Sequence, residues 1–302
     1  MIQATKDNII SIVTPSYNQG EFIERTLKSV IEQPGDFYID YIVMDGKSTD
    51  QTVSILESCM QELHSGNIAS EYKGRVFKKD NTGKYKVNCL GVSFQYFSEK
   101  DKGQTNAINK GWELALGSII AWLNSDDVYT EGALNEVYRE YLKEGMQVLY
   151  GVGLHIDKND KLLEVYPVET YSFERLLDYC FICQPTVFLR RNVWESIGAL
   201  NESLAYCMDY EYWLRIGKIY DFYFLNKTIA CTRIHENTKT SQNLNVHSEI
   251  VQMQKRLVGR VSQHWIFYYA YYSLRKIQFF GDGLVLKILT RVYAFLLRFK
   301  LQ

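Results

Sequence analysis

The sequence predicts an α/β protein with a mainly parallel sheet and helices on both faces. Two observations support this prediction. Short apolar runs alternate with stretches of helical spacing from the N-terminus onward, and repeated units of this kind are typical of parallel sheets. In addition, polar clusters follow three of the apolar runs, at the strand ends where such sheets bind their ligands.

The expected elements follow from these runs in chain order. Strands are predicted at residues 9–14, 41–44, 92–97, 119–123, 148–156 and 186–189. Helices are predicted at residues 21–32, 105–116 and 132–144. A further helix is expected after Asp50, whose side chain can cap it. The regular alternation ends near residue 150, and mixed strands and short helices follow.

Two regions depart from the alternation. Residues 65–91 are polar and contain glycines and lysines, and we interpret them as an inserted loop or hairpin within a domain of residues 1–245. Residues 246–302 are basic and aromatic and are predicted to be a helical C-terminal region. From residue 251 onward there are nine Lys and Arg residues and one acidic residue, whereas the first 250 residues hold 25 basic and 34 acidic ones. This asymmetry predicts an anionic partner for the C-terminal region.

The anionic partner is expected to be a membrane surface and not a nucleic acid, because the C-terminal region is rich in aromatic and aliphatic residues. Residues 283–299 form an apolar helical pattern with a basic stripe of Lys287, Arg291 and Arg298. No run reaches the ~18 uncharged residues that span a bilayer, so residues 255–302 are predicted to bind the membrane peripherally. Packing on the rest of the protein and a contact in a homo-oligomer are the alternatives.

The remaining composition predicts a cytoplasmic protein, attached peripherally to the inner face of the cell membrane. The N-terminal residues show no basic region followed by an apolar run, and the six cysteines are expected to be reduced thiols. Cys180 and Cys183 have the spacing of a zinc or redox pair but no second Cys/His pair nearby, so core packing is expected. No motif supports binding of ATP or a dinucleotide.

Two adjacent acidic residues, Asp126 and Asp127, directly follow the apolar run at residues 119–123. Two neighbouring carboxylates can both be desolvated only if a positive charge joins them. Mg²⁺ or Mn²⁺ would suit a few carboxylates together with diphosphate oxygens. We therefore expect Asp127 to ligate the metal and Asp126 to hold ribose or sugar hydroxyls. The alternative is an N-cap cluster in front of the helix at residues 132–144.

Four segments occur in order: TPSYN at 14–18, DGKSTD at 45–50, SEKDKGQ at 98–104 and WLNSDD at 122–127. Together they resemble the family 2 glycosyltransferases of the GT-A fold. The resemblance implies a Rossmann-like sheet and an inverting, metal-dependent enzyme that moves a sugar from a nucleotide-sugar, expected to be a UDP-sugar, to a hydroxyl acceptor. By analogy alone, the acceptor is a glycan or a lipid-linked glycan in bacterial surface polysaccharide synthesis.

The resemblance assigns the nucleoside to the first two loops. Pro15, Tyr17 and Asn18 would contact the base and ribose, and Asp45 would accept a hydrogen bond from the uracil imide N–H. Tyr17 is alternatively a turn aromatic that covers the core. Contacts with the nucleotide and donor sugar are implied for Asp101, Gly103, Gln104 and Asn106. Many relatives carry Asp in place of Asn106, and an amide cannot balance a cation, which leaves the role of Asn106 open.

The resemblance places the reacting groups in the second half of the chain. Asp209 matches the family's catalytic base, which takes the proton of the acceptor hydroxyl. The alternative is that Asp209 caps a helix and Glu211 is the base. Arg233 and His235 match a closing Arg-x-His element, in which His235 would ligate the metal and Arg233 would contact the diphosphate. A structural role is the alternative for His235.

Two other functions are compatible with the same sheet. A sugar nucleotidyltransferase would need a Gly-rich basic loop after the first strand, where this chain has Tyr17-Asn18-Gln19. A non-catalytic nucleotide-sugar-binding protein would not need the acidic residues of the reaction, and Asp127, Asp209 and His235 are all present.

Overall fold

A computed structural model describes residues 2–80, 82–235, 243–276 and 284–301. The chain forms two compact units, and each is considered by itself. The first consists of Met1–Thr170, Ile182–Leu200 and Tyr220–Ile234, and the second of Tyr171–Phe181, Asn201–Ile219 and His235–Gln302. Three segments of residues 1–245, namely 171–181, 201–219 and 235–245, belong to the same unit as the C-terminal helices.

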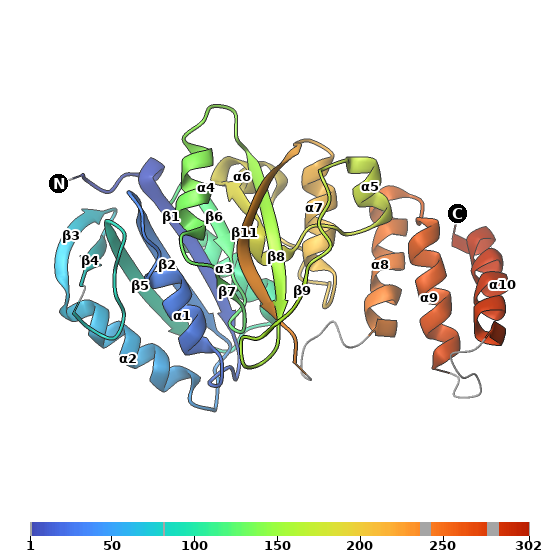
Figure 1. The fold of residues 1–302 in the computed structure, drawn as a ribbon, viewed down its shortest axis with the longest axis horizontal. Coiled ribbons are helices and arrows are strands. Elements are labelled where there is room, and N and C mark those ends of the chain that lie inside the picture. Colours follow the sequence, from blue (N-terminus) through green and yellow to red (C-terminus); the bar gives the residue numbers. More distant parts are fainter. Residues whose placement is uncertain (1, 81, 236–242, 277–283, 302) are drawn as a thin grey trace. The chain divides into compact units, whose positions relative to one another are not determined.

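The first unit is built on one sheet, which has eleven strands among the described residues (Figure 1). The strands are β1 (Ile9–Ser16), β2 (Tyr38–Asp45), β3 (Asn67–Tyr72), β4 (Arg75–Lys79), β5 (Gly91–Ser98), β6 (Ile119–Trp122), β7 (Val128–Tyr129), β8 (Val148–Ile156), β9 (Leu162–Val165), β10 (Phe188–Arg190) and β11 (Phe222–Arg233). Their order is β3-β4-β5-β2-β1-β6-β10-β8-β11-β7, and β9 pairs with β8.

The sheet is mixed, and its parallel part is the one that the sequence predicted most clearly. The neighbours β5, β2, β1 and β6 run parallel to one another, as do β8 and β11. The pairings of β3, β4, β7, β9 and β10 are antiparallel. The carboxyl ends of the four central parallel strands therefore meet at one edge, where a ligand site is expected.

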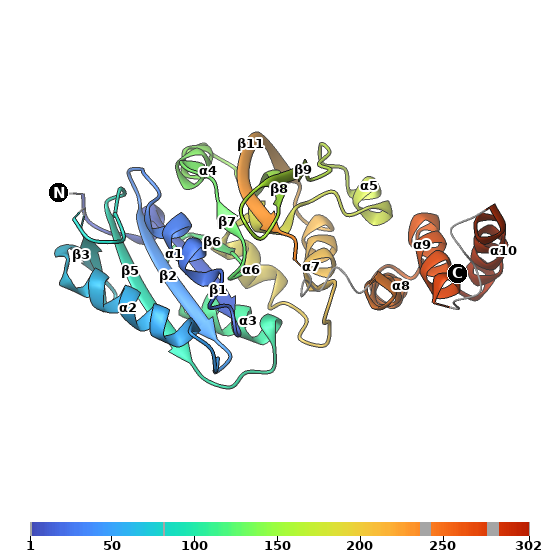
Figure 2. The same cartoon turned by 60° about the horizontal axis from the view of Figure 1, so that its bottom comes forward.

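Helices cover both faces of this sheet, as Figure 2 shows. The helices of the first unit are α1 (Ile23–Ile31), α2 (Thr52–Ser65), α3 (Gln104–Leu114), α4 (Ala133–Tyr141) and α6 (Arg191–Ile197). On one face, α1, α2 and α4 pack on a buried cluster that includes Ile10 and Ile12 of β1. On the other face, Trp112 of α3 contacts Trp122 of β6 and Trp194 of α6, with ring centroids 5.3 and 6.4 Å apart. Burial on both faces explains the continuous apolar runs of the central strands.

Residues 65–91 contain the β3–β4 hairpin, which extends the sheet beyond β5. The hairpin is fixed by an ion pair of 2.9 Å between Arg75 and Asp40, whose side chain is completely buried in β2. Burial raises the pKa of Asp40, although the charge of Arg75 and a hydrogen bond from Ser11 oppose this. The segment is therefore integrated into the sheet, which the polar composition did not reveal.

The second unit is helical and includes the predicted C-terminal helices. Its helices are α5 (Phe173–Asp178), α7 (Met208–Gly217), α8 (Asn243–Val258), α9 (Gln263–Arg275) and α10 (Leu284–Leu301). The buried hydroxyl of Tyr210 in α7 donates to Leu176 O at 2.6 Å and lies 3.1 Å from Trp265 Nε1 of α9 and Gln254 Nε2 of α8. This one phenol therefore connects four helices of the unit.

α9 packs between α8 and α10 (Figure 1). His247 of α8 contacts the rings of Trp265, Tyr268 and Tyr272, with centroids 5.7, 5.8 and 4.7 Å apart. Burial lowers the pKa of His247. Within the described parts of the chain, none of the helices combines the length and the apolar character needed to cross a bilayer.

Candidate active site

The loops that follow β1 and β2 are joined by side-chain to backbone hydrogen bonds. Asn18, which has a positive φ of 51°, donates its N–H to Ser48 Oγ at 2.7 Å and accepts from the N–H of Thr49 through Oδ1 at 2.8 Å. Asp50 Oδ2 accepts from the N–H of Gly20 at 2.8 Å. Asn tolerates this left-handed backbone better than most residues. Asn18, predicted to contact the nucleoside, therefore also shapes the loop that would hold it.

Asp45, the last residue of β2, is 2% exposed and is held by two serines. Ser48 donates its Oγ–H to Oδ1 at 2.5 Å and its N–H to Oδ2 at 2.9 Å, and Ser98 at the end of β5 donates to Oδ2 at 2.6 Å. A carboxylate offers about four acceptor positions. Three are occupied by these donors, so one acceptor position of Asp45 remains.

Tyr17 and Asp101 converge over Gly46. A Cβ atom at Gly46 would lie 3.1 Å from Asp101 Oδ2 and 3.4 Å from Tyr17 Cδ2. Tyr17 is 61% exposed, which does not fit the alternative that its ring covers the core. Asp101 Oδ1 accepts from the N–H of Gly103, whose φ of 110° favours glycine just before α3. The ends of β1, β2 and β5 thus bring together three of the predicted donor-binding segments.

A chain of amide groups links the start of α3 to the acidic pair. Gln104 Nε2 donates to Asn124 Oδ1 at 2.7 Å, and Asn124 Nδ2 donates to Asp127 Oδ2 and to Gln184 Oε1, each at 3.1 Å. Gln184 Nε2 donates in turn to Trp122 O at 3.0 Å. Asn106, the fourth predicted residue of this segment, accepts from the N–H of Lys102 at 3.3 Å and so stabilises the turn before α3.

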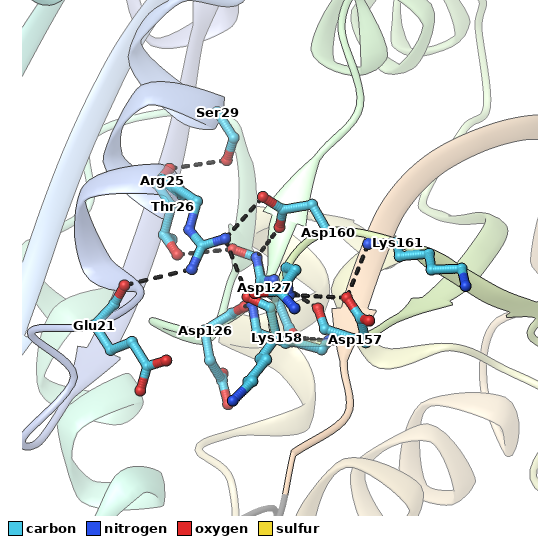
Figure 3. Close-up of polar contacts among 12 residues, drawn as sticks. Glu21, Arg25, Thr26, Ser29, Asp126, Asp127, Asp157, Lys158, Asp160 and Lys161 are labelled. Carbon is cyan, nitrogen blue, oxygen red and sulfur yellow. Dashed lines mark hydrogen bonds and ion pairs between the residues drawn. The ribbon is translucent and has the colours of Figure 1, made fainter.

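Asp127, which the sequence predicts to ligate a metal, is a buried carboxylate held by protein hydrogen bonds. It is 1% exposed, and its second oxygen, Oδ1, accepts from the N–H of Arg233 at 2.9 Å. Burial raises the pKa of Asp127 well above its ordinary value, and the charge of Asp126 raises it further. Each oxygen accepts one protein hydrogen bond, so acceptor positions remain on both oxygens, although burial limits access to them. Asp126 is only half-buried, and Figure 3 shows the two side chains pointing in different directions.

Arg233 fastens the end of β11 to the acidic pair, and its side chain is completely buried. Nε donates to Asp126 O at 2.8 Å, and one terminal nitrogen donates to Asp157 O at 2.9 Å. The other terminal nitrogen forms an ion pair of 2.5 Å with Asp160. The second oxygen of Asp160 pairs with Arg25 of α1 at 2.8 Å (Figure 3). All three nitrogens therefore face protein groups, and the diphosphate contact of Arg233 stays a prediction.

Asp160 lies in the β8–β9 turn, with a positive φ of 68°. Partial burial raises its pKa, but hydrogen bonds from Arg25 and Arg233 outweigh this and hold the pKa below its ordinary value. The two arginines thus keep Asp160 ionised, and the turn is held against α1 and the backbone of Asp126.

In the second unit, Asp209 lies in the first turn of α7 and is half-buried, with Oδ1 accepting from the N–H of Tyr210 at 2.8 Å. Glu211 is 6% exposed and forms an ion pair of 3.0 Å with Arg215. Burial raises the pKa of Glu211, although Arg215 opposes it. Because Glu211 is enclosed and paired, Asp209 is the more accessible of the two candidate bases.

The segment just before Asp209 is held by Glu249 of α8. Three successive backbone N–H groups, of Ala205, Tyr206 and Cys207, donate to its carboxylate at 2.8, 2.7 and 2.8 Å. Burial raises the pKa of the Cys207 thiol, and the carboxylates of Glu249 and Asp209 raise it further, so this thiol stays neutral. Glu249 was not predicted from the sequence, because forty residues separate it from Asp209 and no motif links them.

His235 is half-buried and follows Arg233 by two residues, in the second unit. The next residues of its sequence element, 236–238, lie outside the described residues. Among the residues that are described, no three or more His, Cys, Asp or Glu side chains form a group that could hold a metal.

Comparison with known proteins identifies the family. The model of "Glycosyl transferase family 2" matches residues 11–87 and 85–198. This chain belongs to glycosyl transferase family 2. As a family 2 glycosyltransferase it is 24% identical to an uncharacterised glycosyltransferase of Rickettsia typhi over 81% of this chain and 70% of the relative. It is 25% identical to the chondroitin synthase of Escherichia coli over 80% of this chain but 31% of that protein.

Solved structures establish the GT-A fold of this family 2 enzyme. S. aureus TarS, residues 1–349 in complex with UDP-GlcNAc, superimposes with a TM-score of 0.57 and 17% identity, covering 89% of this chain and 73% of that one. The mannosyltransferase PcManGT of Pyrobaculum calidifontis, in complex with GDP-Man and Mn²⁺, gives a TM-score of 0.57 and 14% identity, covering 95% and 79%. Asp209, Arg233 and His235 lie beyond the residues matched by the family model.

Proposed function

We propose that this family 2 glycosyltransferase moves a sugar from a UDP-sugar to a hydroxyl acceptor, with inversion and with the help of a divalent metal. The observation that carries the proposal is the convergence of Asp45, Tyr17, Asp101 and Asp126 at the carboxyl ends of parallel strands. In open α/β sheets this edge is where ligands bind.

The nucleoside is assigned to the ends of β1 and β2. Asp45 retains one acceptor position, which suits the imide N–H of uracil, and the exposed ring of Tyr17 can stack on a pyrimidine. The proposed donor-binding set is completed by Pro15, Asn18, Asp101, Gly103, Gln104, Asn106, Asp126 and Arg233. The UDP-GlcNAc complex of TarS supports uridine, whereas the GDP-Man complex of PcManGT shows that the fold also accepts guanosine.

The metal, Mn²⁺ or Mg²⁺, is proposed to bind at the acidic pair, through Asp127 as the sequence predicts or through Asp126, which is the more accessible of the two. The half-buried carboxylate of Asp126 stands next to a carboxylate whose oxygens already accept protein hydrogen bonds. One or two protein ligands plus diphosphate oxygens are a common setting for Mg²⁺, so the residues present fit such an ion. His235 is the second proposed ligand. When bound, the ion would neutralise charge on the leaving diphosphate.

Asp209 is proposed as the general base. In an inverting transfer, the bond from the acceptor oxygen to the anomeric carbon forms as the bond to the diphosphate breaks, and the acceptor proton passes to Asp209. The enclosure of Glu211 and the accessibility of Asp209 support this choice.

The acceptor is proposed to be a glycan or a lipid-linked glycan of a bacterial surface polysaccharide. Relatives named chondroitin synthase and hyaluronan synthase support a polysaccharide acceptor. The charge of the C-terminal region supports a position at the anionic inner face of a membrane, because residues 251–302 carry nine basic residues and one acidic residue.

A donor screen tests the proposal. Purified protein with Mn²⁺ is expected to release UDP slowly from one UDP-sugar, and EDTA is expected to stop the release. Asp126→Ala should lower the rate at least about 10²-fold through loss of a metal ligand, whereas Asp221→Ala, at an exposed carboxylate of the same unit, should not change it.

Other outcomes of the screen point to the competing functions. Release of pyrophosphate from a nucleoside triphosphate would indicate a sugar nucleotidyltransferase. UDP binding in a thermal shift assay without turnover of any donor would indicate a non-catalytic protein of the same fold. Turnover that resists EDTA would remove the metal from the proposal while leaving the donor.

Glu249→Gln tests whether α8 positions the base. An amide turns an N–H₂ group toward at least one of the three backbone donors, so the segment before Asp209 should loosen. We expect kcat to fall by about tenfold, equivalent to one lost charge-assisted hydrogen bond, with the donor KM unchanged. Glu131→Gln, at an exposed position, is the control. A loss of thermal stability with unchanged kcat would show that Glu249 is only structural.

A further inference from the structure

One face of α10 is apolar and exposed along the whole helix. This α10 stripe consists of Val285, Ile288, Val292, Phe295, Leu296 and Phe299, which are between 50% and 73% exposed. Their spacing of three and four residues places them on one side of a helix, within an arc of about 100°. A contiguous apolar surface of this kind is typical of an interaction site, not of a solvated face.

The orientation of this face is set by contacts on other sides of the helix. Leu286 and Thr290 are completely or almost completely buried, and α10 packs against α9. At the C-terminal end, Lys255 of α8 donates to Leu301 O at 2.6 Å. Because these contacts hold α10 from the other side, the α10 stripe cannot turn into the interior of the helical unit.

The stripe is bordered by positive charge. Lys287, Arg291 and Arg298 lie along one border, within about 40° of one another, and Lys300 lies along the opposite border. All four are exposed, and α10 contains no Asp or Glu. An apolar stripe between rows of cations is the pattern of a helix that lies in the headgroup region of an anionic bilayer.

We propose that the α10 stripe inserts into the surface of an anionic lipid membrane, with the helix axis parallel to the membrane plane. A perpendicular helix would bury its cations, which are distributed from residue 287 to residue 300. A second copy of the chain is a poorer partner, because a symmetric pairing of two α10 stripes brings like charges together without any acidic residue on either helix.

This inference narrows the predicted membrane region of residues 255–302 to α10. The rings of α9 contact α8 and one another, so most of the aromatic side chains that suggested membrane anchors are partly enclosed within the helical unit. The inference rests on the proposed membrane partner and not on the chemistry of sugar transfer. Vesicle binding and donor hydrolysis therefore test the two separately.

The test is sedimentation of the full chain with phosphatidylcholine vesicles, with and without phosphatidylglycerol. Binding is expected only when phosphatidylglycerol is present, and it should weaken with salt. Phe295→Ser/Phe299→Ser should weaken binding more than tenfold, because two exposed aromatic side chains no longer enter the lipid. Lys287→Gln/Arg291→Gln should weaken it about tenfold or more.

Matched controls substitute equivalent residues elsewhere. Leu162→Ser/Leu163→Ser removes two side chains of β9 that are 55% and 53% exposed, and Lys73→Gln/Lys227→Gln removes two exposed charges. Both should bind vesicles like the unsubstituted protein, and all variants should hydrolyse the donor equally in vesicle-free buffer.

Absence of vesicle binding by the unsubstituted protein would overturn the membrane partner. Unchanged binding by both α10 variants would overturn the α10 assignment, and self-association abolished by Phe295→Ser/Phe299→Ser without vesicle binding would identify a second copy instead.

Discussion

Asp209→Asn is expected to lower kcat for sugar transfer by about 10²- to 10⁴-fold, the range contributed by a general base. The amide preserves the shape of the side chain but cannot take up the acceptor proton at neutral pH. The donor KM should remain nearly unchanged, because the groups assigned to the donor lie at the ends of the parallel strands. Initial rates of UDP release with an acceptor present measure both constants.

The comparison variant is Glu211→Gln. Its main expected effect is on stability, because Glu211 is enclosed and its ion pair with Arg215 would be broken. Thermal unfolding separates the two cases: Asp209→Asn should unfold at nearly the same temperature as the unsubstituted protein. Full activity in Asp209→Asn together with inactivity in folded Glu211→Gln would reverse the assignment of the base.

Arg233→Met is expected to lower the free energy of unfolding by about 3 kcal/mol. The substitution removes hydrogen bonds to Asp126 O and Asp157 O and leaves Asp160 without its buried partner. This expected loss of unfolding free energy is smaller than the largest losses for broken buried ion pairs, because Asp160 is half exposed and water can solvate it. Denaturant unfolding measures the difference, and the affinity for the metal should fall as well, since the backbone of Asp126 is no longer held.

Arg25→Met supplies the matched control, because Arg25 pairs with the other oxygen of Asp160 but is 36% exposed. Arg25→Met is expected to lower the free energy of unfolding by less than about 1 kcal/mol. The pair of variants also tests the diphosphate role that the sequence predicted for Arg233. An Arg233→Met protein of unchanged stability with a strongly raised donor KM would support that role.

The parallel core of the fold was predictable because its strands are buried on both faces and appear as uninterrupted apolar runs. The strand at residues 148–156 was predicted with the bounds that β8 has. The β3–β4 hairpin was less visible, since its attachment depends on Arg75 reaching a buried Asp40 in a distant strand. Such a contact leaves no periodic pattern in the sequence.

The candidate site was predictable at the level of loops but not of individual side chains. The two neighbouring aspartates are chemically identical in the sequence, and only burial separates Asp127 from Asp126. Likewise, the sequence does not show whether the guanidinium of Arg233 contacts a ligand or protein groups. In the structure, its three nitrogens face protein groups. Roles that depend on solvent access are set by tertiary packing, which motif spacing does not encode.

The carboxylate of Glu249 also has a consequence for protein engineering. A chimera that exchanges residues 1–245 for the equivalent part of another transferase would bring in a foreign loop before the base and combine it with the resident Glu249. The three backbone N–H groups at residues 205–207 must then meet this carboxylate in the same register. A chimera designed to change donor specificity should therefore keep residues 201–219 and α8 from the same protein. Only the loops that follow β1, β2 and β5 should be exchanged.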